Sequence, residues 1–574
     1  MLAGQNGILT QSKEAKEQTE IGKEKEIVVL AATDSRMNNS QNMLEEVEFQ
    51  TTIDNYAKGE AEISQAGKEF IVYFINTNRF YTVDENGNVE LANDIEVVKD
   101  PYPGDYTKNE NGEELYGTSD SPYEINCVED LIELSNQSLN GEKFDGKYIQ
   151  LNKTVNIESS LSYSDYNNTE LFGDYNGDGV TESIKNELTN KDGCGFKPIR
   201  SFAGTFIGNG NKIKNLYMST SNASNSKFAF IKENTGNIDE LELSGSINYK
   251  VQQLTSTFNC IGGFVGLNEG NIRNSKNDID ININVTSGAK TVYGGGIAGG
   301  TDGGVTIENC QNTGNINIIT PTESIDIRVG GITGRLDGAS TVNNCINASE
   351  TIHIETLGYL FIGGIASDVY NNSIITNCSN SSKIEGITGT NSSKARIYMG
   401  GIISSTNYSN DMEVKSCFNT GILYASGYAP KIGGILGDGI VKVIKNCYNT
   451  GSIETSAISL NASVGGIIGN CGGTIQIENA YNVGSFILEG QTTFKGAIYG
   501  NGLSGGTVKN CYYIKQEGLE IGGNINNIQA INSSEKTAEQ MKLDEIIESL
   551  NKDGGEFKKD INNINKGYPI LNRQ

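Results

Sequence analysis

The chain has 574 residues, including 70 glycines but only 7 prolines, and it carries a formal net charge of −26. This charge would repel a phosphate backbone or an anionic lipid surface, which argues against nucleic acid as a partner. Ten cysteines are too dilute for a small disulfide-rich scaffold, and no C-x-x-C pair suggests zinc or redox chemistry. The sequence shows neither a run of about 18 apolar residues nor a signal-peptide pattern.

The first hundred residues predict a long helix followed by a small β region. In residues 6–33, NGILTQSKEAKEQTEIGKEKEIVVLAAT, glutamate and lysine recur at helical spacing, while Ile21, Val28 and Ala32 form an apolar stripe. Residues 68–91, KEFIVYFINTNRFYTVDENGNVEL, predict strands joined by turns that contain asparagine and glycine.

This N-terminal region, residues 1–100, resembles the N-terminal region of type IV pilin-like proteins of Gram-positive anaerobes. In those proteins such a helix continues an apolar membrane segment, and here Met1-Leu2-Ala3-Gly4 stand where that segment should end. The resemblance implies pilus subunits as partners and a membrane attachment only through a segment missing from this chain. The alternative is a solvated helix that caps the domain that follows.

We interpret residues 101–120 as a linker and residues 121–530 as one repeat domain. Near the start of this domain, after Asn126, apolar residues recur at helical spacing: Val128, Leu131, Ile132 and Leu134. A short helix there would cover the first coil of the domain, because an open sheet edge invites pairing with other chains.

The sequence DYNGDGVTE, residues 174–182, matches the first nine positions of a calcium-binding loop. Its candidate ligands are Asp174, Asn176, Asp178, the carbonyl of Val180, and Glu182. Lys185 stands where a bidentate glutamate is expected, so Ca²⁺, the only cofactor that the sequence suggests, would bind weakly. A metal-free turn is the alternative, because Asp-Gly and Asn-Gly suit turns equally well.

Two motifs recur with a common period of about 33 residues. One is an N-C-x-N-like string, centred on Ser275, Cys310, Cys345, Cys378, Cys417, Cys447, Ala480 and Cys511. The other is a glycine doublet, xGG[IF]xG, whose copies begin at Ile261, Gly294, Val329, Ile362, Met399, Ile432, Val464 and, in a decayed form, Lys495. Between the motifs the chain alternates with period two, as in IDININV and IHIET, and shows no helical spacing.

These repeats predict a mainly β fold, a right-handed parallel β-helix solenoid with one coil per repeat. An N-terminal α-helix with a small β region and a C-terminal capping helix complete the predicted architecture. The right-handed sense follows from the general preference of parallel crossovers and from the family resemblance given below. Equivalent positions of successive coils then stack about 4.8 Å apart, so that each motif position becomes a column.

The cysteine column comprises Cys310, Cys345, Cys378, Cys417, Cys447 and Cys511. We interpret these cysteines as small buried hydrophobes, because Ala480 and Ser275 replace cysteine in two repeats. A nucleophile or metal site is disfavoured, since the only histidine, His353, cannot serve every coil. Disulfides between adjacent coils stay open as an alternative.

A second column, two residues after the first, consists of Asn277, Asn312, Asn347, Asn380, Asn419, Asn449 and Asn482. Stacked amides can hydrogen-bond from coil to coil, which would satisfy polar groups near a tight corner. The glycine doublets would either turn the backbone with positive φ or pack closely against a neighbour.

An aromatic column follows the cysteines by one residue and contains Phe418, Tyr448, Tyr481 and Tyr512. Because alternate residues of a strand face opposite sides, we expect these rings to point outward, where aromatic rows can stack on sugar rings. They are therefore the candidate glycan-binding site. The alternative is an aromatic ladder that stiffens the sheet beneath a corner loop or the C-terminal cap.

Carboxylates that could support polysaccharide chemistry are Asp278 with Asp280, Glu323 with Asp326, and Asp438. None recurs in register on neighbouring coils, and no column of arginine or lysine accompanies them. The sequence thus predicts no catalytic residues, and a polysaccharide lyase or hydrolase is kept as the alternative function.

Residues 531–574 predict a C-terminal cap. The string T-A-E-Q, residues 537–540, matches a capping box, and Leu543, Ile546, Ile547 and Leu550 would share one helical face. We expect this helix to seal the last coil.

The string xGG[IF]xG followed by N-C-Y-N-T-G resembles the GLUG-type repeat of bacterial surface proteins, including the β-helical region of immunoglobulin A1-specific metallopeptidases. The resemblance covers residues 120–574 and implies a fold but not the peptidase, because a chain with one histidine cannot form H-E-x-x-H. We therefore predict a non-enzymatic, extracellular or cell-surface stalk or adhesion module whose partner is a surface glycan or a protein.

Overall fold

The computed structural model describes residues 2–39, 44–58, 61–66, 69–74, 79–84, 86–92, 116–157, 172–173, 182–183, 195–221, 225–288, 290–322, 325–389, 395–406, 412–502, 504–524 and 528–574. The chain divides into two compact units, residues 1–99 and 100–574. Strands account for 54% of the chain and helices for 11%, which confirms the predicted mainly β class.

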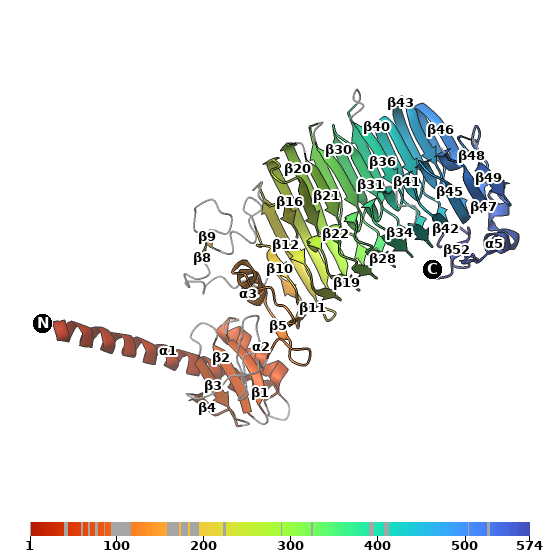
Figure 1. The fold of residues 1–574 in the computed structure, drawn as a ribbon. Coiled ribbons are helices and arrows are strands. Elements are labelled where there is room, and N and C mark those ends of the chain that lie inside the picture. Colours follow the sequence, from red (N-terminus) through yellow and green to blue (C-terminus); the bar gives the residue numbers. More distant parts are fainter. Residues whose placement is uncertain are drawn as a thin grey trace. The chain divides into compact units, whose positions relative to one another are not determined.

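The first unit combines two helices with one antiparallel sheet (Figure 1). Its elements are α1 (Leu2–Asn38), α2 (Glu46–Ala57), β1 (Ala61–Ala66), β2 (Glu69–Phe74), β3 (Arg79–Val83) and β4 (Val89–Ala92), with the strands in the order β1-β2-β3-β4. The predicted helix and strands are therefore present. No helix among the described residues is both long and apolar enough to cross a membrane.

The α1 helix packs on this sheet through the apolar stripe that the sequence predicts. Val28 and Ala32 are fully buried, and the stripe also carries a buried carboxylate, Glu24. Arg79 of β3 lies 3.2 Å from Glu24, and the Tyr81 hydroxyl donates a 2.8 Å hydrogen bond to it. A buried charge needs such partners, so this triad fixes how helix and sheet pack together.

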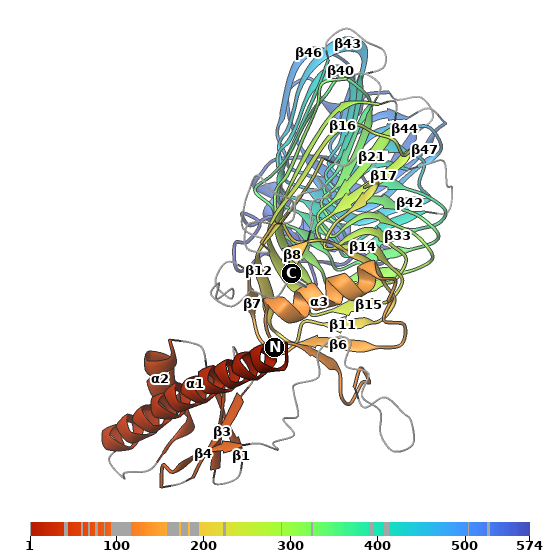
Figure 2. The ribbon, with the colours of Figure 1, turned by 90° about the vertical axis from the view of Figure 1, so that its left-hand side faces the viewer.

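The second unit is a parallel β-solenoid of about nine turns, as predicted (Figures 1 and 2). Each coil has four faces, named A to D in chain order, and every strand pairs in parallel with its equivalents in the coils before and after. In the coil that runs from residue 258 to residue 287 these are β17 (Phe258–Gly262), β18 (Val265–Asn268), β19 (Asn271–Arg273) and β20 (Lys276–Ser287). The glycine doublets join face A to face B, and the N-C-x-N strings join face C to face D.

Faces A and B are built from short strands. Face A contains β13 (Lys227–Phe228), β17, β21 (Thr291–Gly295), β26 (Asp326–Gly330), β31 (Leu360–Gly363), β36 (Arg396–Gly400) and parts of β40 (Leu423–Gly433), β43 (Ile453–Gly465) and β46 (Phe486–Gly502). Face B contains β10 (Ile199–Phe202), β14 (Ile231–Asn234), β18, β22 (Ala298–Thr301), β27 (Thr333–Leu336), β32 (Ala366–Val369), β37 (Ile403–Thr406), β41 (Leu436–Gly439), β44 (Ile468–Cys471), the end of β46 and β48 (Glu520–Gly522).

Faces C and D complete each coil. Face C contains β5 (Tyr123–Ile125), β6 (Tyr148–Leu151), β11 (Thr205–Ile207), β15 (Asn237–Asp239), β19, β23 (Thr306–Glu308), β28 (Thr341–Asn343), β33 (Ile374–Thr376), β38 (Glu413–Lys415), the first parts of β42 (Val443–Asn449), β45 (Ile475–Asn482) and β47 (Gly506–Ile514), and β49 (Ile528–Ile531). Face D contains β7 (Val155–Asn156), β12 (Lys212–Thr220), β16 (Glu242–Gln253), β20, β24 (Gln311–Asn312), β25 (Ile316–Thr320), β29 (Ile346–Asn347), β30 (Thr351–Thr356), β34 (Ser379–Asn380), β35 (Lys383–Thr388), β39 (Phe418–Asn419), the remaining parts of β40, β42, β43, β45, β46 and β47, and β50 (Ser534–Lys536).

The predicted cysteine column lies inside the solenoid. All six members, Cys310, Cys345, Cys378, Cys417, Cys447 and Cys511, are at most 1% exposed, and Ala480 occupies the same register between the last two. Each thiol donates to the carbonyl oxygen two residues earlier, at 3.0–3.3 Å. All nine cysteines of the described residues are free thiols, so the disulfide alternative does not apply to them.

The predicted asparagine column forms a continuous amide ladder. Each side-chain Nδ2 donates to the Oδ1 of the next coil at 2.8–2.9 Å, from Asn277 through Asn312, Asn347, Asn380, Asn419 and Asn449 to Asn482. At the two ends of the ladder, Asn277 Oδ1 and Asn482 Nδ2 have no hydrogen-bond partner among the described residues. A one-way ladder must leave one acceptor and one donor unpaired at its ends.

The glycine doublets lie against this amide ladder. A Cβ atom on Gly401, the second glycine of its doublet, would lie 2.1 Å from the Gly434 carbonyl oxygen and 2.6 Å from the Asn419 side chain. The doublets do not adopt positive φ. Of the two predicted roles, close packing is therefore the correct one, and it links the two motifs of the repeat.

The left-handed backbone lies elsewhere, at the residue before each cysteine position. Residues Asn274, Asn309, Asn344, Asn377, Ser416, Asn446, Asn479 and Asn510 have φ between 48° and 56°. Asparagine tolerates this conformation better than most residues. The amides also stack, for instance Asn344 on Asn309 at 2.8 Å and Asn510 on Asn479 at 2.9 Å. This column was not predicted, although the asparagine that recurs directly before the cysteine position indicates it in the sequence.

The predicted helix at the start of the solenoid is α3 (Val128–Leu139), and it lies beside β10 at that end (Figure 2). Val128, Leu131 and Leu134 are fully buried. The hydroxyl of Ser135 donates to the Lys197 carbonyl at 2.7 Å, so the helix occupies the free edge of the first coil.

The C-terminal segment contains η2 (Gln540–Lys542), α5 (Asp544–Leu550), β51 (Phe557–Lys558) and β52 (Ile570–Leu571). The predicted capping box forms, because the Thr537 amide donates to Gln540 Oε1 at 2.9 Å and the Gln540 amide donates to Thr537 Oγ1 at 3.2 Å. Leu543, however, precedes α5 and is 51% exposed, so it does not share the buried helical face as predicted.

The segment also does not close the last coil as predicted. It runs back along the side of the solenoid until Arg573 donates to the Ser416 and Cys378 carbonyls at 3.2 and 3.4 Å. Meanwhile Ala530 of the last coil, which shares the inward register of the buried Val508, is exposed. The cap stabilises the coils laterally, through an apolar contact described below.

The predicted calcium loop lies outside the described residues. Only its margins are described, where β8 (Phe172–Gly173) pairs with β9 (Glu182–Ser183) in an antiparallel ladder. Calcium binding by Asp174, Asn176, Asp178, Val180 and Glu182 therefore stays a prediction.

Candidate functional site

The aromatic row Phe418, Tyr448, Tyr481 and Tyr512 forms as predicted on four successive coils. The Phe418 and Tyr448 rings stack with centroids 4.8 Å apart, and Tyr448 and Tyr481 stack at 4.9 Å. However, Tyr448 and Tyr481 are fully buried beneath the C-terminal segment, packed against Met541, Ile546, Leu550, Phe557 and Leu571.

Polar contacts hold the row in this covered state. The Tyr448 hydroxyl lies 2.8 Å from Gln574 Oε1, and the Tyr481 hydroxyl donates to the Pro569 carbonyl. Asn565 donates to the Tyr481 hydroxyl at 2.8 Å. A sugar ring has no access to these rings, so the predicted glycan site is wrong. The alternative interpretation, a ladder beneath the C-terminal cap, is the one that the structure shows.

A different surface, the corner groove, combines aromatic and charged side chains around an open cavity, which the aromatic row lacks. It is a cavity of about 480 Å³ where face A meets face B. Its lining residues are Arg328, Phe361, Asp368, Tyr370, Tyr398, Ser405, Thr406, Lys431, Asp438, Gly439, Asn470 and Gly472. The glycine doublets turn the chain between the two faces, so two columns of side chains flank the groove.

The face A column places two stacked aromatic rings between two cations. Arg328, Phe361, Tyr398 and Lys431 occupy one register on successive coils. The Phe361 and Tyr398 rings stack at 4.5 Å with an interplanar angle of 7°. The Arg328 guanidinium lies 4.3 Å from the Phe361 centroid, and the Lys431 ammonium lies 5.3 Å from that of Tyr398. Such cation–π contacts close both ends of the stack.

The face B column carries carboxylates. Asp368, Ser405 and Asp438 share one register on successive coils. Asp368 forms an ion pair with Arg328 and accepts a 2.7 Å hydrogen bond from the Tyr370 hydroxyl. Asp438 lies 3.1 Å from Lys431. On the two coils next to Asp438 the same register holds Ser405 and Asn470, so no carboxylate recurs on a neighbouring coil, as predicted, and Asp368 lies two coils away. Arg328 and Lys431 are single cations at the two ends of the face A column and do not form a column of cations.

The charged lining continues toward earlier coils. Arg335 Nη1 lies 3.2 Å from Asp302, and Arg335 also pairs with Asp337. Its guanidinium lies 5.3 Å from the Phe258 ring and 5.5 Å from the Tyr370 ring. The groove and its continuation thus carry three cations and four carboxylates, a smaller excess of acid than in the whole chain.

The groove offers hydrogen bonds more than free aromatic faces. The faces of Phe361 and Tyr398 are occupied by each other and by cations, so their edges line the cavity. Burial raises the pKa of the Tyr370 and Tyr398 phenols, which keeps both hydroxyls protonated as donors. The Tyr370 hydroxyl already donates to Asp368, and the Asn470 amide donates to Asp438 at 2.5 Å. The Tyr398 hydroxyl as a donor and the carboxylate oxygens as acceptors are therefore the groups that would meet a polyhydroxylated ligand.

The other predicted carboxylates do not gather into a site. Asp278 accepts a 2.8 Å hydrogen bond from Thr313, and Asp280 accepts one of 2.8 Å from the Asn315 amide, so both connect adjacent coils. Glu323 lies outside the described residues, and Asp326 lies 3.8 Å from Arg328. His353 lies between two glutamates at 3.0 and 3.3 Å. The described residues contain no group of three side chains able to hold a metal ion.

One variable position of the repeat indicates the groove in the sequence, although it was not predicted to form a site. The second residue before each glycine doublet varies from coil to coil, and in the groove it is Arg328, Phe361, Tyr398 and Lys431. Register on face A turns this variable position into a column. The sequence alone does not show that this column faces the carboxylate column of face B.

Comparisons with known proteins agree with the predicted repeat. The family model of the GLUG motif matches residues 259–282, which run from β17 into β20 and include one glycine doublet and Asn277, the first member of the asparagine column. The chain therefore contains a GLUG motif. No curated protein sequence matches it significantly.

One solved structure is similar across much of the chain. It is a crystal structure of a Bacteroides ovatus protein described provisionally as an immunoglobulin A1 protease. The identity is 16% and the TM-score 0.28, over 80% of this chain and 94% of that one.

Proposed function

We propose that this chain is an extracellular, non-enzymatic β-helical module that binds a surface glycan in the corner groove. The observation that carries the proposal is the pairing of two columns across one groove, cations and aromatic rings on face A and carboxylates on face B. The GLUG motif, a repeat of bacterial surface proteins, supports the extracellular location.

The regular spacing of side chains along the groove suits an extended saccharide better than a compact ligand. Successive coils present equivalent positions about 4.8 Å apart, close to the spacing of sugar units in an extended chain. Asp438 and Asn470 then offer side-chain groups to successive hydroxyls along the same line. The near balance of charge favours a neutral or weakly charged glycan.

A glycan array probed with the full chain tests the proposal. The best ligand would then be titrated by calorimetry into the Tyr398→Ala variant, which removes one ring of the face A column. We expect affinity to fall at least tenfold, or about 1.4 kcal/mol. Tyr424→Ala is the matched control, because Tyr424 lies on the face D part of β40, away from the groove.

If Tyr398→Ala and Tyr424→Ala both bind the glycan with unchanged affinity, the corner groove is not the binding site. An array without any bound glycan would remove glycan binding, and a protein ligand would then be the partner to seek.

A polysaccharide lyase or hydrolase is the second candidate, and the carboxylates of the groove favour it. Asp368 and Asp438 lie two strand spacings apart, roughly 10 Å, slightly beyond the separation typical of inverting glycosidases. Each is already engaged by a cation, however, whereas a general acid must carry and release a proton.

Product analysis separates the two candidates. Release of reducing ends or unsaturated products by the full chain, abolished in Asp438→Asn, would establish the enzyme and contradict the non-enzymatic proposal. Binding without products supports the module.

The N-terminal unit adds a proposal about attachment. Its long helix packed on a four-stranded antiparallel sheet is consistent with a pilin-like subunit that carries the solenoid at the cell surface. A pull-down of pilus subunits by residues 1–99 fused to an inert carrier would test it.

A further inference from the structure

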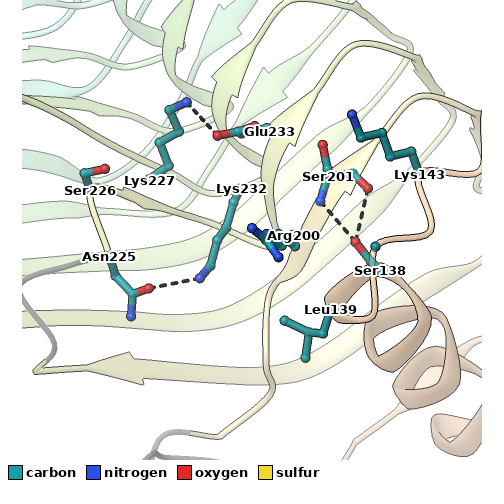
Figure 3. Close-up of a pocket in the computed structure, with 11 residues that line it drawn as sticks. Ser138, Leu139, Lys143, Arg200, Ser201, Asn225, Ser226, Lys227, Lys232 and Glu233 are labelled. Carbon is teal, nitrogen blue, oxygen red and sulfur yellow. Dashed lines mark hydrogen bonds and ion pairs between the residues drawn. The ribbon is translucent and has the colours of Figure 1, made fainter.

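A basic cavity lies near the start of the solenoid, away from the corner groove (Figure 3). It measures about 670 Å³ and lies between the end of α3 and strands β10, β13 and β14. Four cationic side chains line it, Lys143, Arg200, Lys227 and Lys232, with Glu233 as the one carboxylate of the lining. Such convergence is unexpected in a chain with a net charge of −26.

Strand register brings two of these cations together. Ile199 pairs with Ile231 and Ser201 with Glu233, so Arg200 and Lys232 occupy the same position on adjacent strands. Like charges directly opposite each other destabilise a sheet. Burial and the nearby Arg200 charge lower the pKa of Lys232, which reflects the same unfavourable proximity.

The protein leaves most of this charge uncompensated. Lys227 lies 2.6 Å from Glu233, and Lys232 donates a 2.9 Å hydrogen bond to the neutral amide of Asn225. Among the described residues, no carboxylate forms an ion pair with Lys143, Arg200 or Lys232. In the next coil Gly266 stands opposite Lys232 and contributes no side chain, and the Lys227 side chain lies beside it.

We propose that this basic cavity binds the oxyanion groups of a small acidic saccharide, carboxylate or sulfate. Arg200 can hold one such group through two parallel hydrogen bonds, and Lys232 and Lys143 can neutralise a second. The cavity is large enough for a disaccharide, whereas the overall charge of the chain would repel a long polyanion such as nucleic acid.

Calorimetric titration of the full chain tests this assignment. The probes are a trisulfated heparin-type disaccharide, digalacturonate, neutral cellobiose, inorganic sulfate and inorganic phosphate. We expect one of the acidic disaccharides to bind, and to bind at least tenfold more weakly to Arg200→Gln and Lys232→Gln. Lys214→Gln is the matched control, because Lys214 is an exposed lysine on neighbouring β12, and it should bind like the wild type.

Thermal melting gives a second readout, in which the substitutions that weaken binding should raise the melting temperature of the free protein. Without ligand, Arg200→Gln and Lys232→Gln should melt at a higher temperature than the wild type, because each removes a like-charge contact. When the acidic disaccharide is added, the melting temperature should rise only for the wild type and Lys214→Gln. Tyr398→Ala in the corner groove should leave this binding unchanged, which separates the basic cavity from the proposed function.

Three results would overturn the proposal: no heat with either acidic disaccharide, equal affinity in the Arg200 and Lys232 variants, or binding of inorganic sulfate or phosphate as tight as that of the disaccharides. The last result would assign the cavity to free oxyanions instead. Were a variant to unfold, wild-type titrations at rising salt would decide, because binding that depends on charge must weaken as salt increases.

Discussion

The asparagine column shows how one residue type can fix the register of a whole solenoid. Asn312, Asn380, Asn419 and Asn449 each accept a hydrogen bond from the coil before, donate one to the coil after, and donate another to the carbonyl two residues ahead, as Asn419 does to Gly421 at 2.9 Å. Asn347 differs, because its other donation goes to the Ser382 hydroxyl. The glycine doublet beside it leaves no space for any other arrangement. Shifting one coil by a residue would break three buried hydrogen bonds at once.

Replacing Asn419 with alanine should therefore destabilise the coils around it. Each buried group left without a partner costs about 1–3 kcal/mol, and this change orphans groups on Asn380, Asn449 and Gly421. Because repeat proteins lose structure locally, we expect faster hydrogen exchange in the two neighbouring coils, measured by mass spectrometry. Asn317→Ala, on the outward side of β25, is the control and should leave exchange unchanged. Equal protection in both variants would contradict the role of the ladder.

The cysteine column gives a second prediction for single residues. Burial raises the pKa of Cys511 to about 12, and it raises the pKa of Cys345 as well. All six column thiols are at most 1% exposed, so a disulfide reagent cannot reach them in the folded chain. We expect the six column thiols to stay unmodified by Ellman's reagent in the native chain and to react fully after denaturation. Rapid reaction in the native state would contradict their interior position.

The C-terminal segment and the aromatic row form one unit of structure. The sequence predicted both elements, including the capping box at Thr537, but it did not show that one covers the other. That contact joins Tyr448 to Gln574, residues 126 positions apart, and no local pattern reports it. The same aromatic spacing would suit an exposed sugar-binding row, so only the position of the cap decides between the two.

Removing the Tyr481 hydroxyl tests this contact. In Tyr481→Phe, the Pro569 carbonyl and the Asn565 amide each lose one partner and keep only their mutual hydrogen bond of 3.2 Å, which should cost about 1 kcal/mol of local stability. We expect limited proteolysis to release the C-terminal segment sooner than in the wild type. Tyr424→Phe, with its half-exposed ring, is the control.

The same contact should respond to alkaline pH. Burial raises the pKa of Tyr481 above its usual value of about 10, so the folded state favours the neutral phenol. Its contribution to stability is complete below about pH 10 and declines as the pH rises through the raised pKa. The difference in proteolysis rate between Tyr481→Phe and the wild type should therefore shrink above pH 10. A constant difference would contradict the buried donor.

At the scale of the whole molecule, the repeat made the fold predictable and left the site unpredicted. A period of about 33 residues with two motifs in phase reports stacking directly, because every coil must repeat the same internal contacts. Outward positions carry no such constraint, so Arg328 and Tyr398 appear in the sequence as unrelated residues. Only the angle between face A and face B brings them opposite Asp368 and Asp438.

A structure of the chain in complex with its best array ligand tests the glycan-binding account most directly. We expect the saccharide to lie in the corner groove, with its hydroxyls hydrogen-bonded to Asp438 and Asn470 and its chain parallel to the stacking direction of the coils. A saccharide bound at any other surface, with the corner groove empty, would contradict it.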